Sequence, residues 1–134
     1  MIELTLRNIN DLQFMKALGK LSSCTHLSPK DAYNVSKIWD VVMAETKKAK
    51  EMYVSLITKY GATDETGGVK KTETAPFFEF KEGVNKEDFV KEYEELLDIK
   101  VTLERNKLAL SKLDKAQLSP VEISSIEVLL EVDN

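Results

Sequence analysis

The side chains best suited to chemistry are Cys24 and His26, two residues apart in the segment "SSCTH". A thiolate and an imidazole act as nucleophile and base when a third group orients the base and nearby donors stabilise an oxyanion. The neighbouring sequence supplies no recognisable set of such groups. A structural zinc site normally needs four sulfur or imidazole ligands, and these two residues are the chain's only cysteine and histidine. We expect a small buried thiol beside a solvated histidine, and a small enzyme using this pair is the alternative to be tested.

Carboxylates are more numerous, and many fall in one predicted helix. These are Glu87, Asp88, Glu92, Glu94, Glu95 and Asp98. Two carboxylates act as general acid and general base only in a cleft that makes their pKa values differ. On an exposed helix face they only make the surface polar. The pair Gly67-Gly68 lacks the glycine spacing and the lysine of a phosphate-binding loop. We therefore expect a protein that is not an enzyme and that has no catalytic residue, cofactor or metal.

Length and composition predict one globular domain over residues 1–134. Hydrophobic residues make up 43% and charged residues 31% of the chain, which has one cysteine, as expected for a reducing interior. No apolar run is long enough to span a bilayer, and the alternating N-terminus is not a secretory signal, so no membrane partner is expected. The net charge is −4 and only Arg7 and Arg105 are arginines. Because arginine usually makes the bidentate contacts to phosphate and guanine, we expect no specific nucleic-acid partner.

Hydrophobic periodicity and capping residues locate the first elements. Strict alternation over 2–7 predicts a half-buried strand. A leucine-rich segment follows, in which we expect Asn8 or Asn10 to cap a short helix. Ser28 is followed by a proline, the residue pair typical of an N-cap and a first helical position. The longest helix is therefore predicted over 29–60.

The apolar stripe of that long helix recurs in steps of four and three residues, a heptad rhythm. Its positions are Val35, Trp39, Val42, Thr46, Ala49, Tyr53, Leu56 and Tyr60. At 1.5 Å per residue the helix would extend on the order of 48 Å, more than the width of a compact domain of this size. We expect the polar segment after it to leave part of the stripe uncovered. This predicts an interface with another protein or with a second copy of the chain, at Val35, Trp39, Val42, Tyr53, Leu56 and Tyr60.

The middle of the chain is predicted from its glycines and its apolar content. Gly61 is expected to end the long helix, as the residue that follows its last turn. Residues 61–76 are so poor in apolar side chains that we predict a mobile loop. A short strand is expected at 77–81, and Asn85 is expected to cap the next helix.

The C-terminal third predicts one more strand and one more helix. Alternation predicts a strand at 99–104, and residues 105–113 form either its extension past a bulge or a hairpin. Ser119 and Glu122 have the spacing of a capping box, which starts the last helix. The predicted fold class is α+β, with one long helix and three shorter helices packed against a small, about three-stranded sheet. The strands of that sheet are 2–7, 77–81 and 99–104.

In its running order the chain resembles a family of small, uncharacterised proteins encoded by tailed bacteriophages. The resemblance starts at "ELTLRNI", continues through the long helix ending "LITKYG" and includes the "DETGG" loop. It then follows the pattern F-x-x-E-Y-x-E-L-L-D over 89–98, "IKVTL" and the closing "LSPVEISSIEVLL". It covers nearly the whole chain. What it implies is a viral origin and a role in virion assembly or in managing the host, without any catalytic residue to carry over.

These observations predict a non-enzymatic bacteriophage protein that acts through protein–protein contacts. The leading expectation is a virion assembly factor or a minor virion component. The alternative is an intracellular regulator or inhibitor of a host protein, for which an acidic surface is a common device. The expected partner is a viral or host protein or a second copy of the chain, and the expected location is the host cytoplasm or the virion.

Overall fold

The computed structural model describes residues 1–74 and 76–132, and its contacts group into two compact units. Unit 1 comprises Met1–Thr46 and Asp98–Asn134, and unit 2 comprises Lys47–Leu97. The division falls within helix α3 (Pro29–Tyr60), which contributes its first 18 residues to unit 1 and the rest to unit 2. The single domain expected over residues 1–134 stays a prediction. No helix in the described ranges has the length and apolar content needed to cross a membrane.

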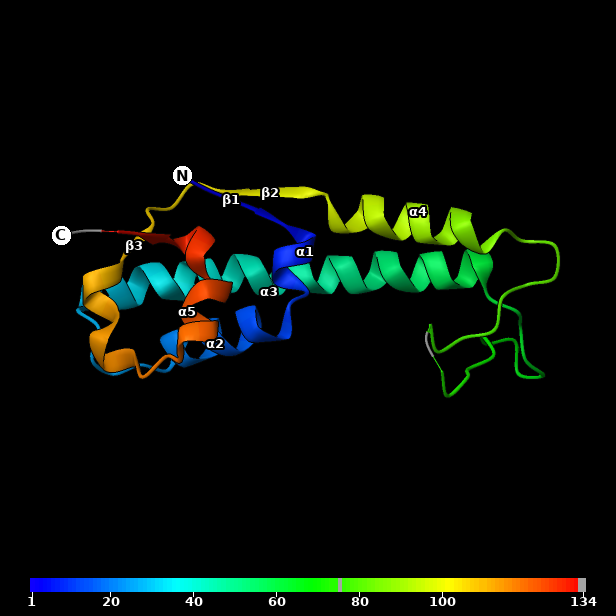
Figure 1. Cartoon of the computed structure of the whole chain (residues 1–134), viewed down its shortest axis with the longest axis horizontal. Coiled ribbons are helices and arrows are strands. Elements are labelled where there is room, and N and C mark those ends of the chain that lie inside the picture. The colour runs from blue at the N-terminus through cyan, green and yellow to red at the C-terminus, as the bar shows by residue number, and fades with distance from the viewer. Residues whose placement is uncertain (75, 133–134) are drawn as a thin grey trace. The chain divides into compact units, whose positions relative to one another are not determined.

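Unit 1 contains a two-stranded antiparallel sheet. Strand β1 (Ile2–Thr5) pairs with β2 (Lys100–Leu103), in the register Ile2↔Leu103 and Leu4↔Val101 (Figure 1). These four side chains are all buried, as the alternation predicts. The outward positions are polar, and the ammonium of Lys100 lies 3.4 Å from a carboxylate oxygen of Glu3.

The predicted first strand is too long, and the predicted caps of the following helix are wrong. Strand β1 ends at Thr5, whose hydroxyl accepts the backbone N–H of Asn8 while Asn8 accepts the N–H of Thr5. This capping box starts a one-turn helix, α1 (Leu6–Ile9), inside the alternating segment. Helix α2 (Leu12–Ser22) is capped by Asp11, which accepts the N–H of Gln13. Leu12, the first residue of this helix, is exposed.

The segment after β2 is neither of the two structures that the sequence left open. Residues 108–109 form β3 (Leu108–Ala109), which pairs in parallel with β4 (Leu130–Glu131). Between them lie the 3-10 helix η1 (Leu110–Ala116), helix α5 (Pro120–Ser125) and the 3-10 turn η2 (Glu127–Leu129). A parallel pair requires such a crossover, because a hairpin joins antiparallel strands only. The described residues thus form two two-stranded sheets rather than one three-stranded sheet.

A buried carboxylate connects α5 to α2 within unit 1. Glu122 accepts the backbone N–H of Ser119 at 3.0 Å and the ammonium of Lys20, on α2, at 2.7 Å. Ser119 in turn accepts the N–H of Glu122, which completes the predicted capping box. The Lys20 hydrogen bond, and then that of the Ser119 N–H, lower the pKa of Glu122 from 4.5 to about 2. The same carboxylate therefore caps one helix and pairs with another.

Unit 2 has its own aromatic core, built on the second half of α3 and on α4 (Lys86–Leu97). As predicted, Asn85 caps α4 by accepting the N–H of Glu87. Phe89 lies at the centre of the core, with ring centroids of neighbouring aromatics at 5.1–6.1 Å. The buried members are Tyr60, Phe78 and Phe89, and the half-buried side chains packed against them are Tyr53, Leu56, Ile57, Val69, Phe80 and Val84.

The segment predicted as a polar loop contributes to this core. Isolated bridges pair Gly61 with Phe80, Thr63 with Val69 and Lys71 with Phe78, so residues 77–81 pair with their neighbours without forming a regular strand. Helix α3 ends at Tyr60, so Gly61 directly follows the helix as predicted, and it does so without a positive φ. A Cβ atom there would lie 2.6 Å from Cγ1 of Val69 and 2.7 Å from the carbonyl oxygen of Ile57. Glycine is required here by this close approach, which brings Val69 and Phe78 onto α3.

We predict that Ser119→Ala lowers the free energy of unfolding by about 0.5–2 kcal/mol, because an N–H at the start of α5 loses its acceptor. Urea unfolding followed by circular dichroism measures the change. Ser124→Ala, at an exposed position of the same helix, is the matched control and should have little effect. Equal effects of the two substitutions would contradict a specific role for the cap.

The lowered pKa of Glu122 predicts a defined pH dependence. Its folded-state pKa of about 2 lies below the ordinary 4.5, so its contribution to stability is complete above pH 4.5 and is lost as the pH falls toward 2. Glu122→Gln should therefore be less stable than wild type at neutral pH, with the difference shrinking over that window. Melting temperatures across the range test this, with the exposed Glu127→Gln as control. A difference in stability between wild type and Glu122→Gln that does not change with pH would show that ionisation of Glu122 does not stabilise the fold.

Candidate functional site

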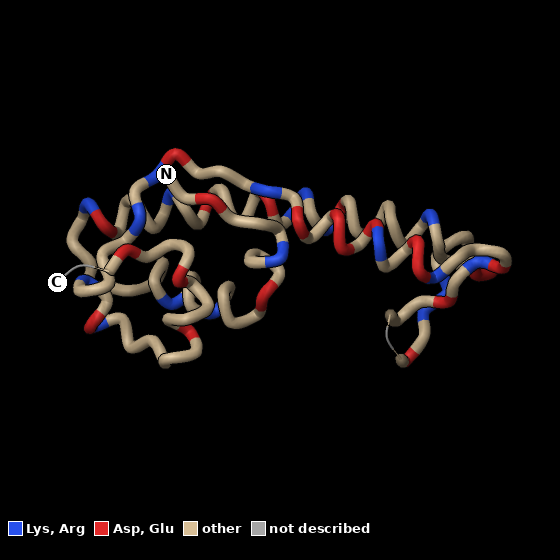
Figure 2. The backbone as a smooth tube through the Cα atoms, turned by 45° about the horizontal axis from the view of Figure 1, so that its top comes forward, with Lys and Arg blue, Asp and Glu red and all other residues tan. Residues whose placement is uncertain are grey.

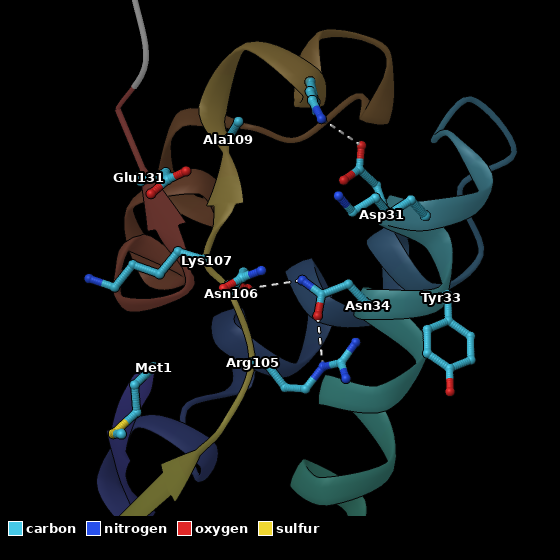
Figure 3. A pocket seen from close by; sticks show the side chains of 11 residues that line it. Met1, Asp31, Tyr33, Asn34, Arg105, Asn106, Lys107, Ala109 and Glu131 are labelled. Carbon is cyan, nitrogen blue, oxygen red and sulfur yellow. Dashed lines mark hydrogen bonds and ion pairs between the residues drawn. The ribbon is translucent and has the colours of Figure 1, made fainter.

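Unit 1 contains a polar pocket of about 680 Å³ between the first turns of α3, the segment that joins β2 to β3, and the start of η1 (Figure 3). Its volume is in the range of small-molecule sites. Lysines, an arginine and amide side chains dominate the lining. The lining residues are Met1, Lys30, Asp31, Tyr33, Asn34, Arg105, Asn106, Lys107, Ala109, Lys112 and Glu131.

Arg105 has a fixed orientation in this pocket. Its Nε–H donates to the side-chain oxygen of Asn34 at 2.8 Å, and the Asn34 amide donates to the carbonyl of Asn106 at 2.9 Å. Figure 3 shows Asn34 bridging these two neighbours. The guanidinium carbon also lies 5.7 Å from the ring centroid of Tyr33, within the range of a cation–π interaction. Asn34 and Tyr33 therefore hold the guanidinium plane in one orientation.

The charges around the pocket are predominantly positive, although the chain carries a net charge of −4. Four cationic side chains line it against two carboxylates. One carboxylate, Asp31, is paired with Lys112 at 3.3 Å and accepts the hydroxyl proton of Ser28 at 2.9 Å. Lys30 and Lys107 form no ion pair with any described residue, which leaves a local excess of positive charge. The arrangement is suited to binding a group that carries negative charge.

The pair that chemistry first suggested, Cys24 and His26, lines a smaller hollow of about 320 Å³ between the loop after α2 and the end of η1. Cys24 is half-buried rather than fully buried, and His26 is exposed. Within the described ranges, no hydrogen bond joins the two side chains. No group of three or more histidine, cysteine or acidic side chains in those ranges is arranged to hold a metal ion.

The six predicted interface positions on α3 differ in their exposure. Val35 and Val42 are buried in unit 1, and Tyr60 is buried in unit 2, so the chain itself covers these three. Trp39, Tyr53 and Leu56 are half-buried. The expectation that the second half of α3 lacks apolar cover is wrong, because Phe78, Phe89 and Tyr93 supply it. An interface at the half-buried positions stays a prediction.

Among the acidic residues of α4, Glu92 is bound within the chain. Its carboxylate accepts the ammonium of Lys59, on α3, at 2.7 Å. The hydrogen bond from Lys59 and, second, the hydroxyl of Tyr60 lower the pKa of Glu92 below its ordinary value. The side chains of Glu87, Asp88 and Glu95 are exposed, as the sequence predicts for a solvated face.

Sequence reasoning missed the Arg105 pocket. Asn34 and Arg105 are 71 residues apart, and no motif connects them. The one feature of the sequence that could have indicated the pocket is the scarcity of arginine. Only two of the 19 cationic side chains are arginines, so each arginine is a candidate for a specific contact.

Comparison of the chain with known family models, curated proteins and solved structures finds no match.

We predict that Asn34→Ala lowers the free energy of unfolding by about 1 kcal/mol, because two partly exposed hydrogen bonds are lost. Chemical denaturation measures this, with Ser36→Ala, at an exposed position of the same helix, as control. The Nε–H resonance of Arg105 should also broaden or shift in the NMR spectrum, since Asn34 is its acceptor. An unchanged Arg105 resonance would show that Asn34 does not orient the guanidinium in solution.

Proposed function

We propose that this chain is a non-enzymatic, bacteriophage-encoded protein that acts by contact with another protein. Its leading role is that of a virion assembly factor or a minor virion component. The viral part of the proposal is supported by the resemblance in running order to small tailed-phage proteins. The contact part is supported by one observation in unit 2, the conformation and exposure of Phe77.

Phe77 combines two unfavourable features. Its backbone has φ 70°, in the left-handed region that a bulky side chain rarely adopts, and its side chain is 62% exposed. Hydrogen bonds of both its backbone groups hold it there: its N–H donates to the carbonyl of Thr74 at 2.8 Å, and its carbonyl accepts the N–H of Thr72 at 3.1 Å. The turn therefore presents an aromatic ring to solvent in a fixed backbone conformation.

The fold does not need an aromatic side chain at this position. Phe78 fills the core of unit 2 from the next residue, at 4% exposure. Glycine or asparagine would adopt the same backbone at lower cost and without exposed apolar surface. Residues in strained backbone conformations cluster at functional sites, and large aromatic side chains are enriched at the energetically important centres of protein interfaces. Binding of the Phe77 ring in an apolar pocket of a partner would explain both the strained backbone and the exposed aromatic ring.

The second candidate, an intracellular regulator or inhibitor of a host protein, is favoured by the distribution of charge. Acidic residues recur along α4, and Figure 2 marks the Asp and Glu residues of the chain in red. The exposed ones are Glu87, Asp88, Glu94 and Glu95. An acidic face of this kind speeds association with a basic surface and selects against other partners. Both candidate functions require contact with a protein. The assembly role requires a viral protein, and the regulator role requires a host protein.

We predict that Phe77→Ser abolishes partner binding and leaves the fold intact, because the side chain contributes little to the core of unit 2. Affinity purification from infected host cells, followed by mass spectrometry, identifies the partner of the wild-type chain. Val90→Ser is the matched control, since Val90 lies in the same unit and is 54% exposed. The control should recover the same partner as wild type, at similar yield.

The same experiment separates the two candidates. Capsid, portal or tail proteins as partners, or the chain itself in purified virions, would support the assembly role. A host protein as the sole Phe77-dependent partner would support the regulator instead. Equal recovery by Phe77→Ser and wild type would remove the observation on which the contact proposal rests.

A further inference from the structure

We propose that the Arg105 pocket binds an acidic peptide segment, with the guanidinium of Arg105 holding one of its carboxylates. This inference rests on the proposed function, because it states the chemistry of a partner protein at a second position. It concerns unit 1, whereas the Phe77 contact concerns unit 2. An experiment can therefore disprove one of the two proposed contacts without affecting the other.

The orientation of Arg105 leaves its two Nη groups available. A guanidinium has two edges that can donate a parallel pair of hydrogen bonds, and both edges use Nη groups. The Nε–H is taken by Asn34 at 2.8 Å, which fixes the plane and leaves the end formed by the two Nη groups. No carboxylate in the described part of the chain lies within ion-pair distance of this guanidinium. A bidentate carboxylate of a partner fits this end without displacing any bond that the fold uses.

The remaining charges of the pocket favour a ligand that carries more than one negative group. The pairing of Asp31 with Lys112 is neutral, so Lys30, Arg105 and Lys107 remain against Glu131. The excess is two positive charges in a chain whose net charge is −4. A segment with neighbouring acidic residues would satisfy Arg105 and one of the lysines together.

The volume and the neutral lining favour a peptide over a small inorganic anion. At about 680 Å³, the pocket is far larger than one oxyanion, since a single water takes up roughly 30 Å³ of liquid volume. The side chains of Asn106 and Tyr33 line the same space and offer polar and aromatic contacts. Amide groups satisfy a peptide backbone, whereas a phosphate needs only the cations.

The test is an NMR titration of the full chain with a short poly-glutamate peptide, following the Nε–H resonance of Arg105 in wild type and the backbone amide resonances of the pocket residues in every variant. A poly-glutamine peptide of the same length controls for the backbone. We expect poly-glutamate to shift the Arg105 resonance, and Arg105→Lys to weaken binding by about tenfold, which is the effect of losing one charge-assisted hydrogen bond. Because this substitution keeps the charge, its effect reports the bidentate geometry.

Lys16→Gln is the matched control for charge. Lys16 is exposed on α2 and lies outside the pocket lining, so removing it lowers the positive charge of unit 1 without altering the site. We expect wild-type affinity for this variant. Lys107→Gln, at an exposed pocket position, should weaken binding even where Arg105→Lys perturbs folding, and circular dichroism verifies the fold of each variant.

Two results would overturn the proposal. Equal affinity of Arg105→Lys, Lys107→Gln and Lys16→Gln for poly-glutamate would show that only the overall charge attracts it. Inorganic phosphate that shifts the Arg105 resonance and displaces the peptide would assign the pocket to a phosphate group. Normal peptide binding by Phe77→Ser, together with loss of the cellular partner, would leave this inference in place and separate it from the Phe77 contact.

Discussion

The apolar stripe of α3 is the constraint on which the rest of the structure depends. A helix of 32 residues presents more apolar surface than one small core can cover, and the chain buries the two ends of the stripe separately. Val35, Ile38 and Val42 are buried in unit 1, and Tyr60 is buried among the aromatic rings of unit 2. The stripe positions nearest the division are Thr46 and Ala49, whose side chains are small. The hydroxyl of Thr46 is satisfied within the helix by the carbonyl of Val42, so this part of the stripe needs little cover.

Where side-chain chemistry determines the local structure, the sequence predicts it well. Ser119 and Asn85 cap the helices that their positions predict, and Ser28 accepts the N–H of Asp31 at the start of α3. The strand register follows from alternation, because a slip by one residue would expose Ile2 and Leu4. Prediction fails where two local patterns compete. Thr5 and Asn8 form a capping box inside an alternating segment, and the helix begins where the strand was expected to continue.

The remaining features depend on contacts between distant residues or on backbone angles. The Arg105 pocket requires Asn34, 71 residues away, and neither residue belongs to a motif. Gly61 follows the end of α3 as its residue type predicts, but the sequence does not show that Val69 and the Ile57 carbonyl occupy the place of a Cβ atom there. The exposure of Phe77 also could not be predicted, because the sequence "FFEF" does not show which phenylalanine faces the core. A segment poor in apolar residues can still supply the few that complete a core.

The two proposed contacts have different physical characters, and this affects what each would contribute to binding. An exposed aromatic ring gains affinity by burial, which is insensitive to salt, whereas the Arg105 pocket depends on charges that salt screens. If one partner engages both, the second contact forms within the same complex, and the combined affinity exceeds that of either alone. Such a partner would lose part of its affinity at high ionic strength and retain the part due to Phe77. A partner that contacts unit 2 alone would bind with little dependence on salt. The salt dependence of the complex thus reports whether the basic pocket takes part, independently of any substitution.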